Sequence, residues 1–405
     1  MRIPPWKRGR VRAQFCVLAI MGVSAPAGAD EPVKSWFQQI TINAFASISY
    51  TWNFNDPADN LNQLRAFDYD HNSLRVDGAE LVLQKAVVNR GDFGFRFDLA
   101  FGAVAHIAAA RGLFRDPKTG VAGDFDLQQV YASYIAPLGH GLRLDVGKFV
   151  TPVGAEFIEG YDGYNDNFSR SLLFTYAIPF THTGLRLSYP FNDHLTAMVM
   201  VVNGWDNVLD NNAAKSFGVA LIITPVAPLC FYVNYIGGPE RDNDNHDFRH
   251  LIDVGAVWKA TGRLTFTVNA DWGFDPNAVP LPVPVTTLPS SLPAVVPADA
   301  GTDTATVAAK NGQWVGAAAY LRAQLTHRFA LSGRGEIFWD VDGYRTGTQQ
   351  RVLEGTITPE LRVTDGLLFR AEFRIDSSDH SVFVRSDGLT RHYQPTVALD
   401  AIYVF

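Results

Sequence analysis

Apolar and polar side chains alternate with a period of two along most of the chain, which is the spacing of a β-strand and differs from that of a helix. In residues 93–102, Phe and Leu occupy every second position, and Gly, Arg, Asp and Ala fill the positions between them. Residues 263–272, 369–376 and 392–405 have the same pattern. Alternation of this kind predicts strands with one apolar face and one polar face.

The pattern predicts about sixteen strands, most of them 10 to 15 residues long, whereas strands of globular proteins average five or six residues. This length argues against a water-soluble β-sandwich, which is the ordinary alternative for an all-β chain. The expected spans are 39–54, 73–88, 93–106, 123–136, 141–151, 180–191, 194–205, 215–225, 228–237, 248–260, 262–273, 312–327, 329–340, 351–363, 366–377 and 391–405.

The connections between these strands are alternately short and long. The long ones are 55–72, 107–122, 152–179, 206–214, 238–247, 274–311, 341–350 and 378–390. Tight turns at one end and long loops at the other are typical of outer-membrane barrels, in which closure leaves no strand edge unpaired in lipid. We therefore predict an all-β fold: a transmembrane, antiparallel, up-and-down β-barrel with short periplasmic turns and long extracellular loops.

Tryptophans lie near the ends of the predicted strands. Trp52, Trp205, Trp272, Trp314 and Trp339 are next to long loops, and Trp258 is near a short turn. This placement predicts aromatic girdles at the two membrane interfaces.

Residues 217–233 contain no charge and approach the length of a transmembrane helix. However, Pro225 and Pro228 interrupt this run, and β-branched residues fill both of its halves. Two strands joined by a turn fit these features better than a helix does.

Residues 1–29 have the three parts of a secretory signal peptide: a basic start, an apolar stretch at 13–23 and a small-residue cleavage site at 27–29. We expect cleavage after Ala29, which would leave residues 30–405 as the barrel in a Gram-negative outer membrane. The signal peptide holds five of the 34 basic residues and none of the 41 acidic ones, so cleavage changes the net charge from −7 to −12. This negative charge argues against a nucleic-acid partner.

Two stretches resemble a known family. Residues 145–156 (DVGKFVTPVGAE) and 169–184 (SRSLLFTYAIPFTHTG), together with 77–81 and 128–131, are similar to hallmark segments of the OmpL-like β-barrel porin family of the porin-2 type. The resemblance implies a porin-like barrel of the Gram-negative outer membrane and leaves the solute open.

Charged residues alternate with the apolar positions of the predicted strands, and a water-filled lumen is the place where a membrane barrel accommodates them at low cost. We expect the following residues to line the pore: Arg96, Asp98, Arg143, Asp145, Lys148, Arg186, Arg334, Glu336, Arg370, Glu372 and Arg374.

The third long connection, residues 152–179, is a candidate constriction loop, because porins of sixteen strands often fold this loop into the lumen. It carries Glu156, Glu159, Asp162, Asp166 and Arg170. We expect these acids to face the basic wall residues Arg96, Arg143 and Arg186, which would create a transverse field. The alternative is an extracellular loop with no role in the pore.

The loop at 274–311 has seven prolines between Pro276 and Pro297, which predicts an extended extracellular segment. The clusters Asp68-x-Asp70-x-Asn72 and Asp242-x-Asp244 begin like calcium loops but lack the required Gly, so we expect no metal and no cofactor. No common catalytic motif occurs, and we expect no enzyme. The pairs Asp70-His71 and Asp379-His380 are the candidates for a catalytic alternative.

These patterns favour a porin that passes small hydrophilic solutes or ions by passive diffusion. The alternative is a non-conducting barrel whose extracellular loops serve adhesion or envelope structure. The expected partners are outer-membrane lipid and lipopolysaccharide, the permeating solutes, and the barrel assembly machinery, which would read the last strand ending in Phe405. A homotrimer is left open.

Overall fold

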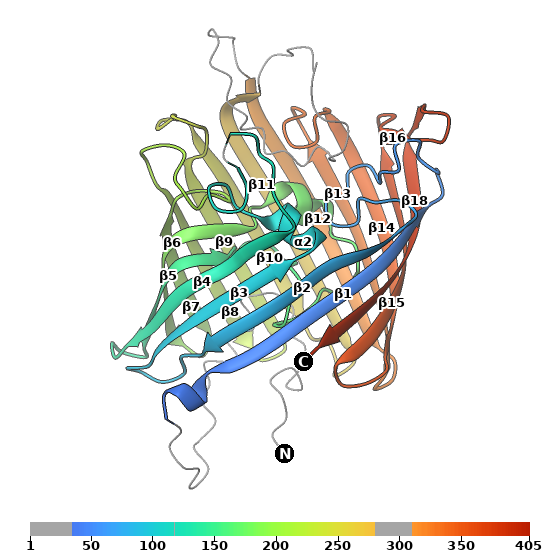
Figure 1. Ribbon diagram of the computed structural model, residues 1–405. Coiled ribbons are helices and arrows are strands. Elements are labelled where there is room, and N and C mark those ends of the chain that lie inside the picture. The colour runs from blue at the N-terminus through green and yellow to red at the C-terminus, as the bar shows by residue number, and fades with distance from the viewer. Residues whose placement is uncertain (1–34, 117, 280–309) are drawn as a thin grey trace.

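The computed structural model describes residues 35–116, 118–279 and 310–405. Sixteen antiparallel strands form one closed barrel (Figure 1), and strands that follow one another in sequence are neighbours around its wall. The predicted signal peptide at 1–29 and residues 280–309 of the proline-rich loop lie outside the described residues. Within the described ranges, no helix is both long and apolar enough to cross a bilayer.

The barrel strands are β1 (Thr41–Asn53), β2 (Ser73–Lys85), β3 (Phe93–Phe101), β4 (Phe125–Ala136), β5 (Leu142–Val150), β6 (Thr181–Asn192), β7 (Leu195–Val202), β8 (Ser216–Val226), β9 (Leu229–Pro239), β10 (Phe248–Trp258), β11 (Leu264–Val279), β12 (Lys310–Gln324), β13 (Phe329–Asp340), β14 (Gln350–Arg362), β15 (Leu367–Ser378) and β18 (Tyr393–Val404). A 3₁₀ turn, η2 (Phe37–Gln39), precedes β1.

The predicted fold class is confirmed, and each of the sixteen predicted segments overlaps one barrel strand. The predicted strand 93–106 is wrong at its end, because Gly102 has a φ of 93° and the chain then forms the short helix α2 (Ala103–Ala108). The last long loop also contains a small hairpin, β16 (Phe383–Val384) and β17 (Thr390–Arg391), which the sequence pattern did not indicate.

The first and last strands close the barrel at the end that carries the short turns. The main-chain N–H of Phe405 donates to the oxygen of Ala44 at 3.0 Å, and the N–H of Ala44 donates to the oxygen of Phe405 at 2.8 Å. The C-terminus therefore lies at this end of the barrel (Figure 1), which corresponds to the periplasmic end in outer-membrane barrels. Closure leaves no unpaired strand edge to face lipid.

The girdle prediction is only partly correct, because the tryptophans differ in exposure; Trp52 is half-buried, with its ring centroid 4.9 Å from that of His71. Trp258, Trp272 and Trp339 are among the exposed large hydrophobic residues, as an interfacial ring requires. Trp205 and Trp314, in contrast, are 7% and 0% exposed, and their rings meet edge to face with 6.2 Å between centroids. These two side chains belong to an apolar cluster within the protein, so they do not face the membrane interface.

The uncharged run at 217–233 forms the hairpin of β8 and β9, as predicted. Phe217, Val219 and Leu221 are exposed on one face of β8, whereas Ala220 and Ile222 on the other face are buried in the apolar cluster. This part of the wall is therefore apolar on both faces, because its inner side contacts other apolar side chains.

We predict that Gly147→Ala destabilises the barrel. Gly147 has a φ of 138°, and a Cβ at this position would press against the carbonyl oxygen of Val130 and lie 2.8 Å from Cα of Tyr131. Both obstacles are backbone, so the cost is expected to be about 2–4 kcal/mol. The temperature at which the purified barrel loses its folded mobility on a gel should fall.

Gly262→Ala is the matched control, because nothing lies within 4 Å of the Cβ position at this turn residue. Equal transition temperatures for the Gly147 and Gly262 variants would contradict the close approach of β4 and β5.

Candidate pore and its internal loop

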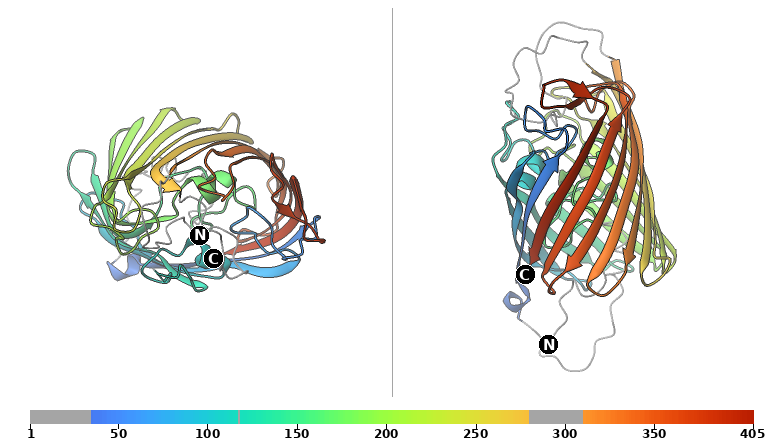
Figure 2. Two further views of the ribbon diagram at one scale, coloured as in Figure 1. Left: turned by 90° about the horizontal axis from the view of Figure 1, so that it is seen from above. Right: turned by 90° about the vertical axis from the view of Figure 1, so that its right-hand side faces the viewer.

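The segment between β5 and β6, residues 151–180, does not project away from the barrel. Viewed along the barrel from above (Figure 2), its green trace and short coil lie inside the ring of strands. The coil is a π-helical turn, η3 (Leu173–Ala177), whose residues are all buried. We call residues 151–180 the internal loop; it corresponds to the segment predicted at 152–179.

The internal loop leaves β5 and immediately binds the opposite wall. The N–H of Gly154 donates to Asp253 Oδ2 of β10 at 3.0 Å, and the N–H of Ala155 donates to Asn269 Oδ1 of β11 at 3.1 Å. Gly154 has a φ of 94°, which favours glycine at this turn. The loop therefore crosses the barrel within its first few residues.

Carboxylates of the internal loop form ion pairs with arginines on several strands. Glu156 binds Arg334 of β13 at 2.8 Å, and Glu159 binds Arg370 of β15 at 3.0 Å. Further along the loop, Asp166 binds Arg322 of β12 at 3.3 Å, and Asp162 binds Arg96 of β3. The loop is thus tied to strands on both sides of the lumen.

Glu159 also forms an ion pair with Arg170 of the same loop, at 3.1 Å. Burial raises the pKa of Glu159, but the guanidiniums of Arg170 and Arg370 oppose burial and bring the pKa below its ordinary value. This carboxylate consequently stays ionised, which strengthens its hold on both arginines.

Carboxylates of the wall accept hydrogen bonds from the main chain of the loop. Glu336 of β13 accepts from Leu172 N at 2.7 Å, and Glu372 of β15 accepts from Phe168 N at 2.7 Å. Buried main-chain N–H groups need such partners, since water does not reach them. Glu336 and Glu372, both predicted to line the pore, are therefore buried as anchors of the loop.

The second half of the internal loop is apolar and packs into the protein. Leu172, Leu173, Phe174, Tyr176 and Ile178 belong to the same buried cluster as the two buried tryptophans. Trp314 Nε1 donates to the carbonyl oxygen of Ala177 at 3.2 Å, so the indole both packs against the loop and binds its main chain.

The loop between β1 and β2 also enters this region. Arg65 is 2% exposed and binds Asp376 of β15 at 2.5 Å, while Arg374 binds the same carboxylate at 2.7 Å. Phe67 lies 5.6 Å from the ring of Phe174, measured between centroids. The sequence analysis missed Arg65, Phe67 and Arg322, because no local pattern marks a loop residue or a single strand residue as the partner of a distant one.

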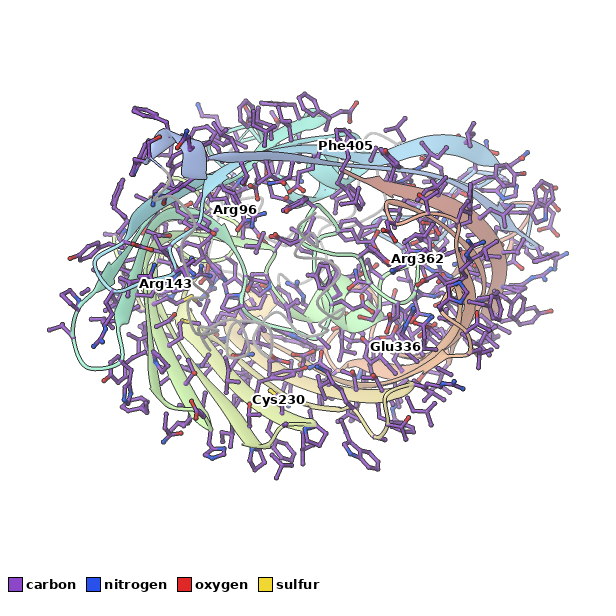
Figure 3. The ribbon with its side chains drawn as sticks, turned by 90° about the horizontal axis from the view of Figure 1, so that it is seen from below. Arg96, Arg143, Cys230, Glu336, Arg362 and Phe405 are labelled. Atoms are coloured by element: carbon purple, nitrogen blue, oxygen red, sulfur yellow. The ribbon has the colours of Figure 1, made fainter. Side chains whose placement is uncertain are left out.

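The predicted pore-lining residues differ in their access to solvent. The side chains of Arg334 and Arg370 are 0% exposed and that of Arg374 is 1%, whereas those of Arg96, Arg143 and Arg186 are 11%, 27% and 12% exposed. In Figure 3, Arg96 and Arg143 lie on one side of the barrel, and Glu336 and Arg362 lie on the other. The buried group surrounds the internal loop, and the exposed group lies on β3, β5 and β6.

The expected contacts between the loop acids and the basic wall were wrong for two of three arginines. Only Arg96 binds the loop, through Asp162, and it also binds Asp98 on its own strand at 2.8 Å. Arg143 and Arg186 bind Asp145 of the wall, each at 2.9 Å.

Lys148 does not reach solvent either. Its side chain is 2% exposed, and its Nζ binds Asp126 and the carbonyl oxygen of Leu127, both at 2.9 Å. This residue therefore stabilises the pairing of β4 and β5 and does not present a free charge to the lumen.

One buried carboxylate has no such partner. Asp271 of β11 is 2% exposed, and neither of its oxygens is hydrogen-bonded within the described part of the chain. It lies directly opposite Asp253 in the strand register, and Asp253 itself accepts bonds from Gly154 N, Asn234 and Asn269. Two carboxylates thus meet at the point where the internal loop crosses to β10 and β11.

Residues considered as metal ligands or catalytic partners in the first loop have structural partners. Asp70 binds Arg75 at 3.0 Å, and His71 Nδ1 accepts from the N–H of Asn53 at 3.0 Å. Over residues 35–116, 118–279 and 310–405, no three His, Cys, Asp or Glu side chains converge as a metal site.

Comparisons with known proteins agree with this architecture. Residues 39–405 match the family described as "Putative beta-barrel porin-2, OmpL-like". No curated protein sequence matches the chain.

Several solved structures are similar in fold. The outer membrane channel DcaP of Acinetobacter baumannii has a TM-score of 0.58 and 11% identity, covering 90% of this chain and 97% of DcaP. An anion-selective porin from Comamonas acidovorans has a TM-score of 0.56 and 8% identity, covering 90% and 99%. OmpF of Salmonella typhi, in complex with daunomycin, has a TM-score of 0.54 and 9% identity, covering 90% and 97%. At these identities the likeness concerns the fold alone.

We predict opposite effects of two Asp→Asn changes on stability. In Asp271→Asn the new amide is able to donate to Asp253, so the unfolding temperature should stay the same or rise. In Asp376→Asn, Arg65 and Arg374 lose their shared carboxylate, which should cost about 3–5 kcal/mol.

The loss of folded mobility on heating measures both variants on one gel. An equal loss of stability in the two variants would show that Asp271 has a partner of its own.

Proposed function

Because the chain belongs to the OmpL-like, porin-2 family of outer-membrane β-barrels, we propose that it passes small hydrophilic solutes and ions by passive diffusion. The observation that carries this proposal is the internal loop, which is tied across the lumen, while the arginines on β3, β5 and β6 keep part of their side chains exposed. In the proposed channel, solutes pass between this loop and the strands from β3 to β6. The internal loop is then the constriction of the pore.

The charges beside this passage support its polar character. Asp162 on the loop has a 58% exposed side chain, and the guanidiniums of Arg143 and Arg186 project from the wall. Acidic groups on one side and basic groups on the other create a field across the passage, which orients polar solutes in transit. The remaining predicted lining residues, such as Arg334 and Arg374, act in this proposal by holding the loop.

The alternative function is a non-conducting barrel that serves adhesion or envelope structure through its extracellular loops. Its support is the dense packing of the internal loop with the buried apolar cluster, which fills part of the lumen. In either function, the barrel assembly machinery is proposed to recognise the last strand through Phe405. Lipopolysaccharide is the proposed lipid partner around the barrel, and a homotrimer is the proposed oligomer.

We predict stepwise conductance when the purified protein is added to a planar lipid bilayer. A variant with Glu156→Gln, Glu159→Gln and Asp166→Asn should have a larger single-channel conductance, because the loop loses its ion pairs with Arg334, Arg370 and Arg322. Asp379→Asn in the last loop is the control, since the side chain of this acid is half exposed and binds the neighbouring His380 and the main-chain N–H of Arg351, and neither partner belongs to the internal loop.

The heat-dependent gel mobility first shows that each variant is folded. Absence of conductance in the unaltered protein would favour the structural alternative, whereas an unchanged conductance in the triple variant would rule out the internal loop as the constriction.

A further inference from the structure

Two partly exposed arginines of the wall share a single carboxylate. Arg143 of β5 donates from Nε to Asp145 Oδ1 at 2.9 Å, and Arg186 of β6 donates from Nε and Nη2 to Asp145 Oδ2 at 3.1 and 2.9 Å. Asp145 also accepts from the hydroxyl of Ser133 at 2.6 Å, and its side chain is 2% exposed. The carboxylate is therefore covered, while the guanidiniums face solvent.

The arginines around the internal loop have a different charge balance. Arg334 binds Glu156 and Glu354, and Arg370 binds Glu159 and Asp400. Each of these buried guanidiniums therefore has two carboxylates, and none of its charge is presented to the passage. Arg143 and Arg186 together have one carboxylate, so the trio with Asp145 has a net charge of one positive unit.

The neighbouring residues fix the Arg186 guanidinium without neutralising it. Its Cζ lies 4.4 Å from the ring centroid of Phe149 and 6.0 Å from that of Tyr131. Such stacking holds the plane of the guanidinium and leaves its edge available. Within the described residues, Nη1 of Arg186 and Nη1 of Arg143 donate to no acceptor.

Arg96 differs from this pair, although it is also partly exposed. It binds Asp98 at 2.8 Å and additionally Asp162 of the internal loop, so its charge is compensated in the same way as that of the buried arginines. The uncompensated positive charge on this sector of the wall is therefore on Arg143 and Arg186.

We propose that Arg143 and Arg186 form a binding site for the oxyanion group of a permeating solute, a carboxylate or a phosphate, and that this site makes the channel prefer anions. The inference rests on the proposed channel function. Guanidinium edges with free N–H groups match the paired oxygens of carboxylates and phosphates, with two parallel hydrogen bonds. Partial exposure allows the solute to bind and leave, as passage through a channel requires.

The first test is the reversal potential of single channels in a potassium chloride gradient. The unaltered protein should be selective for chloride, and Arg143→Gln with Arg186→Gln should lower the chloride-to-potassium permeability ratio by about two- to fivefold. Asp145→Asn should shift this ratio in the opposite direction, because it removes the only acid of the trio. Arg328→Gln, the same change in an exposed turn, should leave the ratio unaltered.

The second test adds succinate or inorganic phosphate to the chloride solution. Either anion should reduce the chloride current in the unaltered channel, and the reduction should disappear in the double variant. Reduction by only one of them supports the site and identifies that anion as its ligand class. If the double variant does not fold, Arg143→Gln alone is used, because its side chain is the more exposed of the two.

A conducting channel that prefers cations, or one whose selectivity is the same in the double variant and in Arg328→Gln, would overturn this inference and leave the channel function standing. A current that neither anion reduces would also overturn the site. Absence of any conductance would instead overturn the proposed function itself.

Discussion

Buried polar groups of the internal loop find their partners mostly on the wall of the barrel and within the loop itself. The interior of this barrel is largely closed to water around the loop, so an unpaired N–H group or carboxylate there costs more free energy than it would outside. The wall answers this requirement in two ways. Arg334 and Arg370 form ion pairs with carboxylates of the loop, while Glu336 and Glu372 accept hydrogen bonds from its main-chain N–H groups. The charges of these strands are therefore determined by the loop that they hold.

This constraint explains why charged residues with the same sequence pattern have different surroundings. Arg334 and Arg143 both occupy alternating polar positions of barrel strands, yet their side chains are 0% and 27% exposed. The first lies where the loop is tied to the wall, and the second lies where the loop is absent. Removing one partner of a buried ion pair leaves the other charge without compensation. Removing a partly exposed arginine is expected to change mainly the electric field across the proposed passage.

The sequence predicts the strands well because lipid imposes the same requirement on every one of them. Outer positions in the bilayer are apolar, so alternation was readable along most of the chain and the fold class followed; in the uncharged run at 217–233, prolines and β-branched residues indicated the two strands. The inner side chains contact different neighbours in each sector of the barrel, and these neighbours come from distant parts of the chain. Trp205 and Trp314 had the sequence position of girdle residues, but they pack with the internal loop. The partners of Asp162 and Asp166 were likewise beyond prediction, since only the path of the loop decides which arginines they reach.

The connectivity of the chain decides which sector of the wall the loop leaves open. The loop leaves β5 after Val150 and enters β6 at Thr181, so both of its ends are fixed at the end of the barrel that carries the long loops. From there it runs at once to β10 and β11 on the far side. Arg143 is the second residue of β5, which places it near the opposite end of that strand. Because the loop reaches the far wall, it does not also cover β5 and β6 near the end of the barrel that carries the short turns. Arg143 and Arg186, which share one carboxylate, therefore lie in a sector that the loop leaves accessible, and this placement connects the proposed constriction with the proposed anion site.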